Sequence, residues 1–393
     1  MATVALGFLV ASLFCGILLP GEGLSVTSTA LLVSSMIALC LWLAAGNRIR
    51  LGIVNGLQGL MLVELLLPLT TTTLLHFWGN YLSFAYAAVS FLCWSNLVRR
   101  QHRRWIVGVL AIYAFVLVGQ IAWRALELAQ QGVFSGVYKL LMVVPFGASN
   151  YLGGPLLILF FVFLCIKGQE VPNRLGWVVL AALLVGMLLI HSRATLAALA
   201  CTLLLYLQVR RRPGGTKMRI VVGSGLAFVL GTVVLIGALT LTGQYGSFTA
   251  GLDFFTGGRI ELLKGAAVAF LRHPWFGSGL GNSPTFSIPG YTIELWHAHN
   301  FVMDLLMFSG GVGMAIQCSV YWVAAQRMRA KIASSPWAMG AFFSLIAILV
   351  DALAEPSVFT YKVDALLWMV LGIGYAAYCS QDTPSIVQLM RKE

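Results

Sequence analysis

The second half of the sequence holds one long polar stretch, residues 257–300, between runs of apolar residues. In so apolar a chain, charged and imidazole groups are costly unless an anion binds or a proton is transferred there. Arginine suits a phosphate or diphosphate because its planar fork donates paired hydrogen bonds, and neutral histidine suits a general base. We therefore expect this stretch, together with Arg193, to form the active site of an enzyme. The basic and imidazole residues in it are Arg259, Lys264, Arg272, His273, His297 and His299.

Two arginines are the candidates for anion binding. Arg193 lies between two apolar runs, at the expected outer mouth of a helical bundle, where an arginine that only reaches lipid phosphates is the alternative. Arg259 follows two glycines and begins an amphipathic segment, where backbone N–H groups at a helix start favour an anion. The helix dipole makes an arginine at that position unfavourable unless an anion compensates. This mismatch favours a binding function for Arg259.

His299 precedes an apolar run and is the candidate general base, with a purely structural histidine as the alternative. His297 lies two residues away and would face another direction on a helix, so the two do not form a metal pair. No HExxH or DxD motif occurs, and the outer acidic residues are scattered. We expect no metal and no cofactor. Possible substrate-binding residues are Lys264, Arg272, Trp296, His297 and Asn300.

Some residues remain open between structural and functional roles. Glu64 and Asp304 lie within apolar runs, where they would either join helices by hydrogen bonds or support the site. Asp351 and Glu355, four residues apart on one helix face, present the same choice. The Gly-rich segment 277–281 follows no strand, so it predicts a loop and not a dinucleotide site.

The composition indicates a membrane protein. Of 393 residues, 59% are hydrophobic and 10% are charged, and the mean hydropathy is +0.89. The net charge of +12 comes from short basic clusters between apolar runs, which is typical of membrane topology signals, so we expect no nucleic-acid partner. The seven cysteines lie in or beside apolar runs, without a CxxC pair, so no disulfide framework is expected.

The positioning elements are predicted to be transmembrane helices, since a span needs about 20 apolar residues. We expect an all-α integral membrane protein with about twelve spans, forming a single domain over residues 1–393. Residues 175–190 and 194–208 are short enough that one broken helix is an alternative. The long outer loop, residues 243–298, separates spans nine and ten and contains an amphipathic helix that ends near His273. The predicted spans are 3–20, 26–46, 52–75, 77–97, 105–123, 150–166, 175–190, 194–208, 220–242, 300–325, 336–354 and 363–379.

The basic residues orient this bundle. With twelve spans and the N-terminus inside, most of the 25 Lys and Arg residues fall in the short cytoplasmic connections, as the positive-inside rule requires. Both termini are then cytoplasmic. The loop at 243–298 and Arg193 lie on the outer side of the membrane.

The order of these motifs resembles the bacterial O-antigen ligase and Wzy-type O-antigen polymerase superfamily. The resemblance covers about residues 190–312, and the earlier spans match only in topology. Its motifs are Ser192-Arg193, Gly258-Arg259 before an amphipathic helix, His273-Pro274-Trp275-Phe276-Gly277-Ser278-Gly279-Leu280-Gly281 and His297-Ala298-His299-Asn300-Phe301.

The resemblance implies a GT-C-like glycosyltransferase of the bacterial inner membrane that uses an undecaprenyl-diphosphate-linked glycan at the periplasmic side. In the ligases the acceptor is a sugar hydroxyl of the lipid A core, and in the polymerases it is the next lipid-linked repeat. The family reaction is metal-independent and inverting. Carried over by motif, Arg193 and Arg259 hold the donor diphosphate and His299 activates the acceptor.

We favour the ligase over the polymerase. Polymerases of the superfamily often carry an Arg-x10-Gly spacing in their outer loops, and neither Arg193 nor Arg259 has a glycine eleven residues later. A secondary transporter is the alternative from another class. It would place its ionisable groups near the middle of the membrane, whereas here they gather on the outer side.

Overall fold

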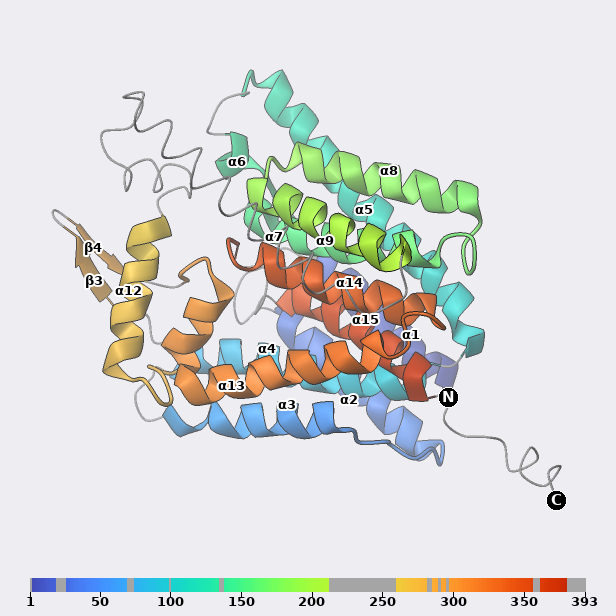
Figure 1. The fold of residues 1–393 in the computed structure, drawn as a ribbon, viewed down its shortest axis with the longest axis horizontal. Helices are drawn as coiled ribbons and strands as arrows, with labels where there is room; N and C mark the ends of the chain where they lie inside the picture. The colour runs from blue at the N-terminus through green and yellow to red at the C-terminus, as the bar shows by residue number, and fades with distance from the viewer. Residues whose placement is uncertain are drawn as a thin grey trace.

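The protein is described here from a computed structural model, which covers residues 2–18, 26–68, 74–98, 100–133, 138–211, 259–280, 285–288, 291–294, 297–355 and 361–379. These residues form a helical bundle with two short antiparallel strand pairs (Figure 1). The elements are α1 (Ala2–Leu18), α2 (Val26–Ala44), α3 (Ile53–Glu64), α4 (Leu74–Leu97), η2 (Arg100–His102), α5 (Arg103–Gln130), α6 (Tyr138–Leu141), β1 (Val143–Val144), β2 (Gly147–Ala148), α7 (Ser149–Ile166), α8 (Asn173–Leu189), α9 (Arg193–Arg211), α12 (Arg259–Arg272), β3 (Thr285–Ile288), β4 (Tyr291–Glu294), α13 (Phe301–Arg329), α14 (Pro336–Asp351) and α15 (Tyr361–Cys379).

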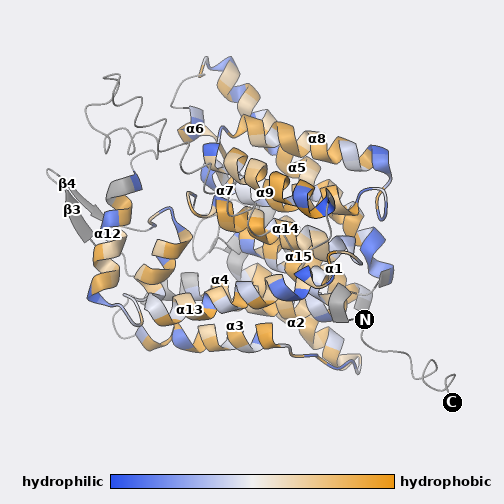
Figure 2. Cartoon of the chain, in the orientation of Figure 1, coloured by the Kyte–Doolittle hydropathy of each residue, from blue (hydrophilic) through white to orange (hydrophobic). Residues whose placement is uncertain are grey.

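The helices are those of a multi-pass membrane protein. Within the described residues, α5, α7 and α13 are long and apolar enough to cross a bilayer, and α3, α8, α14 and part of α2 are shorter apolar helices. Figure 2 shows hydrophobic residues along the bundle and hydrophilic ones gathered towards its ends. Every predicted span except 220–242, which lies outside the described residues, overlaps a helix. The count of twelve spans and the GT-C-like arrangement stay predictions.

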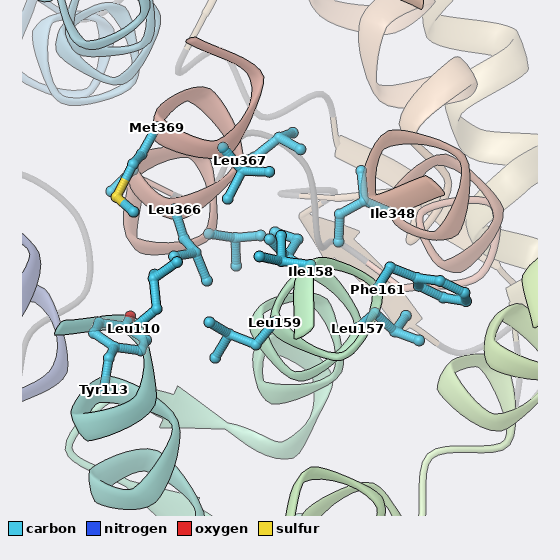
Figure 3. Close-up of a cluster of buried hydrophobic side chains, with 14 of the residues drawn as sticks. Leu110, Tyr113, Leu157, Ile158, Leu159, Phe161, Ile348, Leu366, Leu367 and Met369 are labelled. Carbon is cyan, nitrogen blue, oxygen red and sulfur yellow. The ribbon is translucent and has the colours of Figure 1, made fainter. Parts of the chain in front are cut away.

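The centre of the bundle is α7. Of the residues of this apolar helix, 89% are buried. A helix that is hydrophobic all round belongs in the interior of a bundle. In Figure 3, Ile158 and Leu159 of α7 lie among Leu110 of α5, Ile348 of α14 and Leu366 of α15. The close packing of α7 with α14 matters for function because α14 leads directly to the candidate site.

Two local predictions were wrong, and one alternative was resolved. The helix α3 ends at Glu64, well before the predicted end at residue 75, and Pro68 downstream cannot continue a helix. The structure has two helices, α8 and α9, and not one broken helix. They run antiparallel to each other in Figure 1. The loop predicted at residues 243–298 contains a β-hairpin, β3 paired with β4, beside its amphipathic helix, so the fold is not strictly all-α.

The helix α12 is fastened across the end of the bundle by the segment that follows it (Figure 1). The helix α13 leaves helical geometry at Gly310 (φ 64°, ψ −165°). There, the backbone N–H groups of Gly311 and Val312 donate to the carbonyls of Pro274 and Trp275, at 2.8 and 3.1 Å. Ser278 N–H donates back to the carbonyl of Met307 at 2.8 Å. The kink and the segment therefore satisfy each other's backbone groups.

Candidate active site

The candidate site is built around Glu355, just beyond the C-terminal end of α14. Its side chain is 2% exposed and has ion-pair partners at both oxygens. Lys139 Nζ lies 2.9 Å from Oε1, and Arg259 Nη2 lies 2.8 Å from Oε2. Such burial is tolerated because the carboxylate is paired with two cations and hydrogen-bonded by them. Segments distant in sequence therefore meet at one carboxylate.

Arg259 is the first residue of α12, as the sequence predicts. The buried face of α12 contains Ala266 and Ala269, which pack with Ala298 and Met307. This contact fixes the helix against the start of α13 and directs Arg259 to Glu355.

His299 lies beside the same carboxylate oxygen as Arg259. Its Nδ1 is 4.0 Å from Glu355 Oε2, which is too long for a hydrogen bond. Nδ1 has no hydrogen-bond partner among the described residues. The pKa of His299 is lowered to about 4, first by its burial and second by the positive charge of Arg259, with Glu355 acting in the opposite direction. The imidazole is therefore neutral near pH 7 and able to accept a proton.

The backbone of His299 adopts the left-handed conformation, φ 53°, which is unfavourable for a side chain larger than glycine. Hydrogen bonds on both sides hold it there. Asp304 Oδ1 accepts from the Ala298 N–H at 2.6 Å, and the Phe301 N–H donates to the Ala352 carbonyl at 2.9 Å. The sequence alone did not show what Asp304 contacts. In the structure its hydrogen bond with the Ala298 N–H fixes the turn that carries the candidate base.

A second left-handed histidine, His191 (φ 53°), forms the turn between α8 and α9. The turn places Ser192 Oγ 3.4 Å from Glu355 Oε1. Arg193, the next residue, is exposed and begins α9. Thr195 Oγ1, within the first turn of α9, donates to Asp351 Oδ1 at 3.0 Å. Asp351 and Glu355 therefore both join the end of α14 to the start of α9.

The other predicted residues do not gather at Glu355. Arg272 is the last residue of α12, about 20 Å along the helix from Arg259 at 1.5 Å per residue. Lys264 and His297 are exposed, and Trp296 lies outside the described residues. Asn300 caps α13, accepting hydrogen bonds from the backbone N–H groups of Val302 and Met303, and its Nδ2 donates to the Leu353 carbonyl at 2.9 Å. Its observed contacts are those of a structural cap.

Sequence reasoning missed two contributors. Lys139 was given no role, and Glu355 was left open between a structural and a supporting role. One signal could have pointed to Glu355: its carboxyl follows a predicted span, and the sequence places cations on the same predicted side of the membrane.

Within the described residues, no group of three or more His, Cys, Asp or Glu side chains is placed to hold a metal ion.

Comparison with known families gives one match. Residues 177–318 match the model of a family described as O-antigen ligase. The match covers less than half of the chain, and it includes Arg193, Arg259 and His299. It confirms the resemblance to the O-antigen ligase superfamily and supports a ligase or polymerase role with lipid-linked glycans. No curated protein matches the chain.

Proposed function

We propose that this chain, whose residues 177–318 match the O-antigen ligase family, transfers a glycan from undecaprenyl diphosphate to a sugar hydroxyl of the lipid A core. The observation that carries the proposal is the convergence of Arg259 and His299 on one oxygen of Glu355. A guanidinium that can hold a leaving diphosphate and a neutral base that can activate a hydroxyl are thus side by side.

Donor binding rests on the arginines. Arg193 and Arg259 each occupy the first position of a helix, α9 and α12, where backbone N–H groups and the helix dipole favour an anion. Arg259 uses one of its five N–H donors on Glu355 and can direct others to a phosphate. When the glycosidic bond breaks, negative charge develops on the diphosphate oxygen, and preorganised cations stabilise it there.

Acceptor activation rests on His299. The acceptor hydroxyl must lose a proton as it attacks the sugar carbon, and the neutral imidazole can take that proton. In the free protein the pKa of His299, about 4, is low for a general base. A bound diphosphate adds negative charge near the imidazole and offsets Arg259, which raises the pKa towards neutrality. Donor binding would thereby prepare the base.

Glu355 is a positioning residue in this scheme. It fixes Arg259 through an ion pair of 2.8 Å and lies 4.0 Å from the imidazole of His299.

The proposed reaction inverts the sugar configuration, because a hydroxyl that enters opposite the held diphosphate attacks the face of the sugar away from the leaving group. The site is proposed to work without a metal, with arginines supplying the positive charge.

The proposed location is the periplasmic end of an inner-membrane bundle with both termini cytoplasmic. In Figure 1, α12 and α6 lie at one end of the bundle, and α9 and α13 finish at the other. The C-terminal ends of α9 and α13 carry basic residues, including Arg210, Arg327 and Arg329. Basic residues concentrate on the cytoplasmic side of membrane proteins. This distribution supports an outward-facing site that meets a flipped lipid-linked donor.

The decisive experiment supplies purified protein with an undecaprenyl-diphosphate-linked glycan. Separate reactions contain lipid A core, a second lipid-linked repeat, or no acceptor. Extension of the lipid A core supports the ligase, and extension of the lipid-linked repeat identifies a polymerase instead. Arg193→Ala and Arg259→Ala should both lose transfer while remaining folded in detergent. Failure to extend either acceptor, with the donor shown to be bound, would contradict the proposal.

A further inference from the structure

Lys139 reaches the candidate site from α6, in the connection between α5 and α7. Its backbone carbonyl accepts a hydrogen bond from Ser149 Oγ at 3.0 Å. The neighbouring Tyr138 hydroxyl donates to the Leu189 carbonyl at 2.9 Å, and its ring packs on His191 with ring centres 4.7 Å apart. These contacts fix the short helix, and with it Lys139, against the turn that precedes Arg193.

The ammonium of Lys139 has capacity beyond its ion pair with Glu355. A lysine has three N–H donors, and one of them reaches Glu355 Oε1 at 2.9 Å. The Lys139 side chain is 35% exposed, whereas that of Glu355 is only 2% exposed. The lysine therefore faces the space outside the buried carboxylate, where a ligand can share its charge.

Lys139 and Arg259 engage different oxygens of the same carboxylate. Two cations held on one buried anion leave a net positive charge, and Arg193 stands one residue from Ser192 at the same carboxylate. A lipid diphosphate presents two anionic phosphoryl groups in a row. The arrangement offers a separate cation for each group, whereas a monophosphate needs only one.

We propose that Lys139 is a further phosphate ligand of the donor site, which gives the site its preference for a lipid diphosphate over a lipid monophosphate. This inference rests on the proposed function and deepens it. The competing explanation is that Lys139 only neutralises Glu355. Under that explanation its loss would destabilise the protein, but it would not change the ratio of the two affinities.

The test measures binding of undecaprenyl diphosphate and undecaprenyl monophosphate to detergent-purified protein. The variants are Lys139→Gln, which removes the charge, and Lys139→Arg, which keeps it. Lys331→Gln, after the end of α13, is the matched control. Lys139→Gln should weaken diphosphate binding about 10- to 100-fold, the value of a charged hydrogen bond, and leave monophosphate binding nearly unchanged. Lys139→Arg and the control should keep the preference.

Each outcome separates the two ideas. If the unaltered protein prefers the diphosphate and Lys139→Gln keeps that preference, the role of Lys139 is wrong and the proposed function stands. If the unaltered protein binds neither lipid, the proposed function itself fails, and this inference fails with it. Equal weakening of both ligands by Lys139→Gln would show a structural role and also overturn the inference.

Discussion

Arg259 and Glu355 are 96 residues apart in the sequence, and their side chains meet at 2.8 Å. The pair joins the first residue of α12 to the end of α14, which packs on the central helix α7. The arginine at the start of α12 is thereby fixed to the end of a helix that packs on the centre of the bundle. Such fixing matters because a catalytic cation must be in place before the transition state forms.

Replacing Glu355 with glutamine should reduce turnover without weakening donor binding. Glutamine accepts at one oxygen only, and its NH₂ group faces a cation, so either Lys139 or Arg259 loses its partner. The remaining positive charge still attracts a diphosphate. We expect kcat to fall by about tenfold or more, with no rise in the donor KM. Steady-state kinetics would measure both, with Glu170→Gln between α7 and α8 as control, and an unchanged kcat would refute the positioning role.

His299→Ala should abolish most transfer while leaving the donor bound. Loss of a positioned base typically costs about 10²–10⁴-fold in rate. The matched control is His273→Ala, since His273 is also a histidine beside a helix end but is exposed after α12. Single-turnover rates and donor affinity should be measured for both variants. Normal transfer by His299→Ala would remove the base from the proposed mechanism.

The pH dependence should reveal the donor's effect on His299. In the free protein its pKa is lowered to about 4, so kcat/KM should stay level as the pH falls through 6.5 and should decline only near pH 4 to 5. The bound diphosphate raises that pKa, because negative charge favours the imidazolium. The acid limb of kcat should therefore lie at a higher pH than that of kcat/KM. Coincident limbs near pH 6.5 would contradict this account.

Transfer should persist in EDTA. Among the described residues, the carboxylate nearest to Arg259 and His299 is Glu355, and its two oxygens are already engaged by Arg259 and Lys139. A divalent ion would have to displace these cations to use it as a ligand. The measurement compares initial rates of glycan transfer with EDTA, with added Mg²⁺ and with added Mn²⁺. Strict dependence on either ion would show that arginines alone do not supply the charge.

Much of the fold was predictable from the sequence, because apolar runs of membrane length each overlap a helix in the described part of the chain. The positions of Arg259 and His299 at helix starts were predictable because each lies in a recognisable motif next to an apolar or amphipathic segment. Glu355 and Lys139 were not, since their pairing spans 216 residues and depends on how α6 and α14 pack. The β-hairpin was missed because its few β-branched and aromatic residues were judged only as part of a polar loop.

Gly277→Ala should test whether the contact between the segment after α12 and the kink in α13 helps to position Arg259. Gly277 has φ 69°, and a β-carbon there would overlap the backbone of Phe308 beside the kink at Gly310. We expect the segment to leave the kink, which costs at least about 1–2 kcal/mol from the backbone conformation alone. Thermal unfolding in detergent should occur at a lower temperature. Arg259 would then be less firmly held at Glu355, so kcat should fall, as expected for Glu355→Gln.

The matched control for that substitution is Gly108→Ala in α5, where an added β-carbon has nothing within 4 Å. Alanine also favours the helical conformation there, so stability should be equal or slightly higher. A Gly277→Ala protein with unchanged unfolding temperature would show that the segment tolerates displacement. Lower stability with unchanged kcat would show instead that Arg259 is held by Glu355 and the α12–α13 contact without help from the kink.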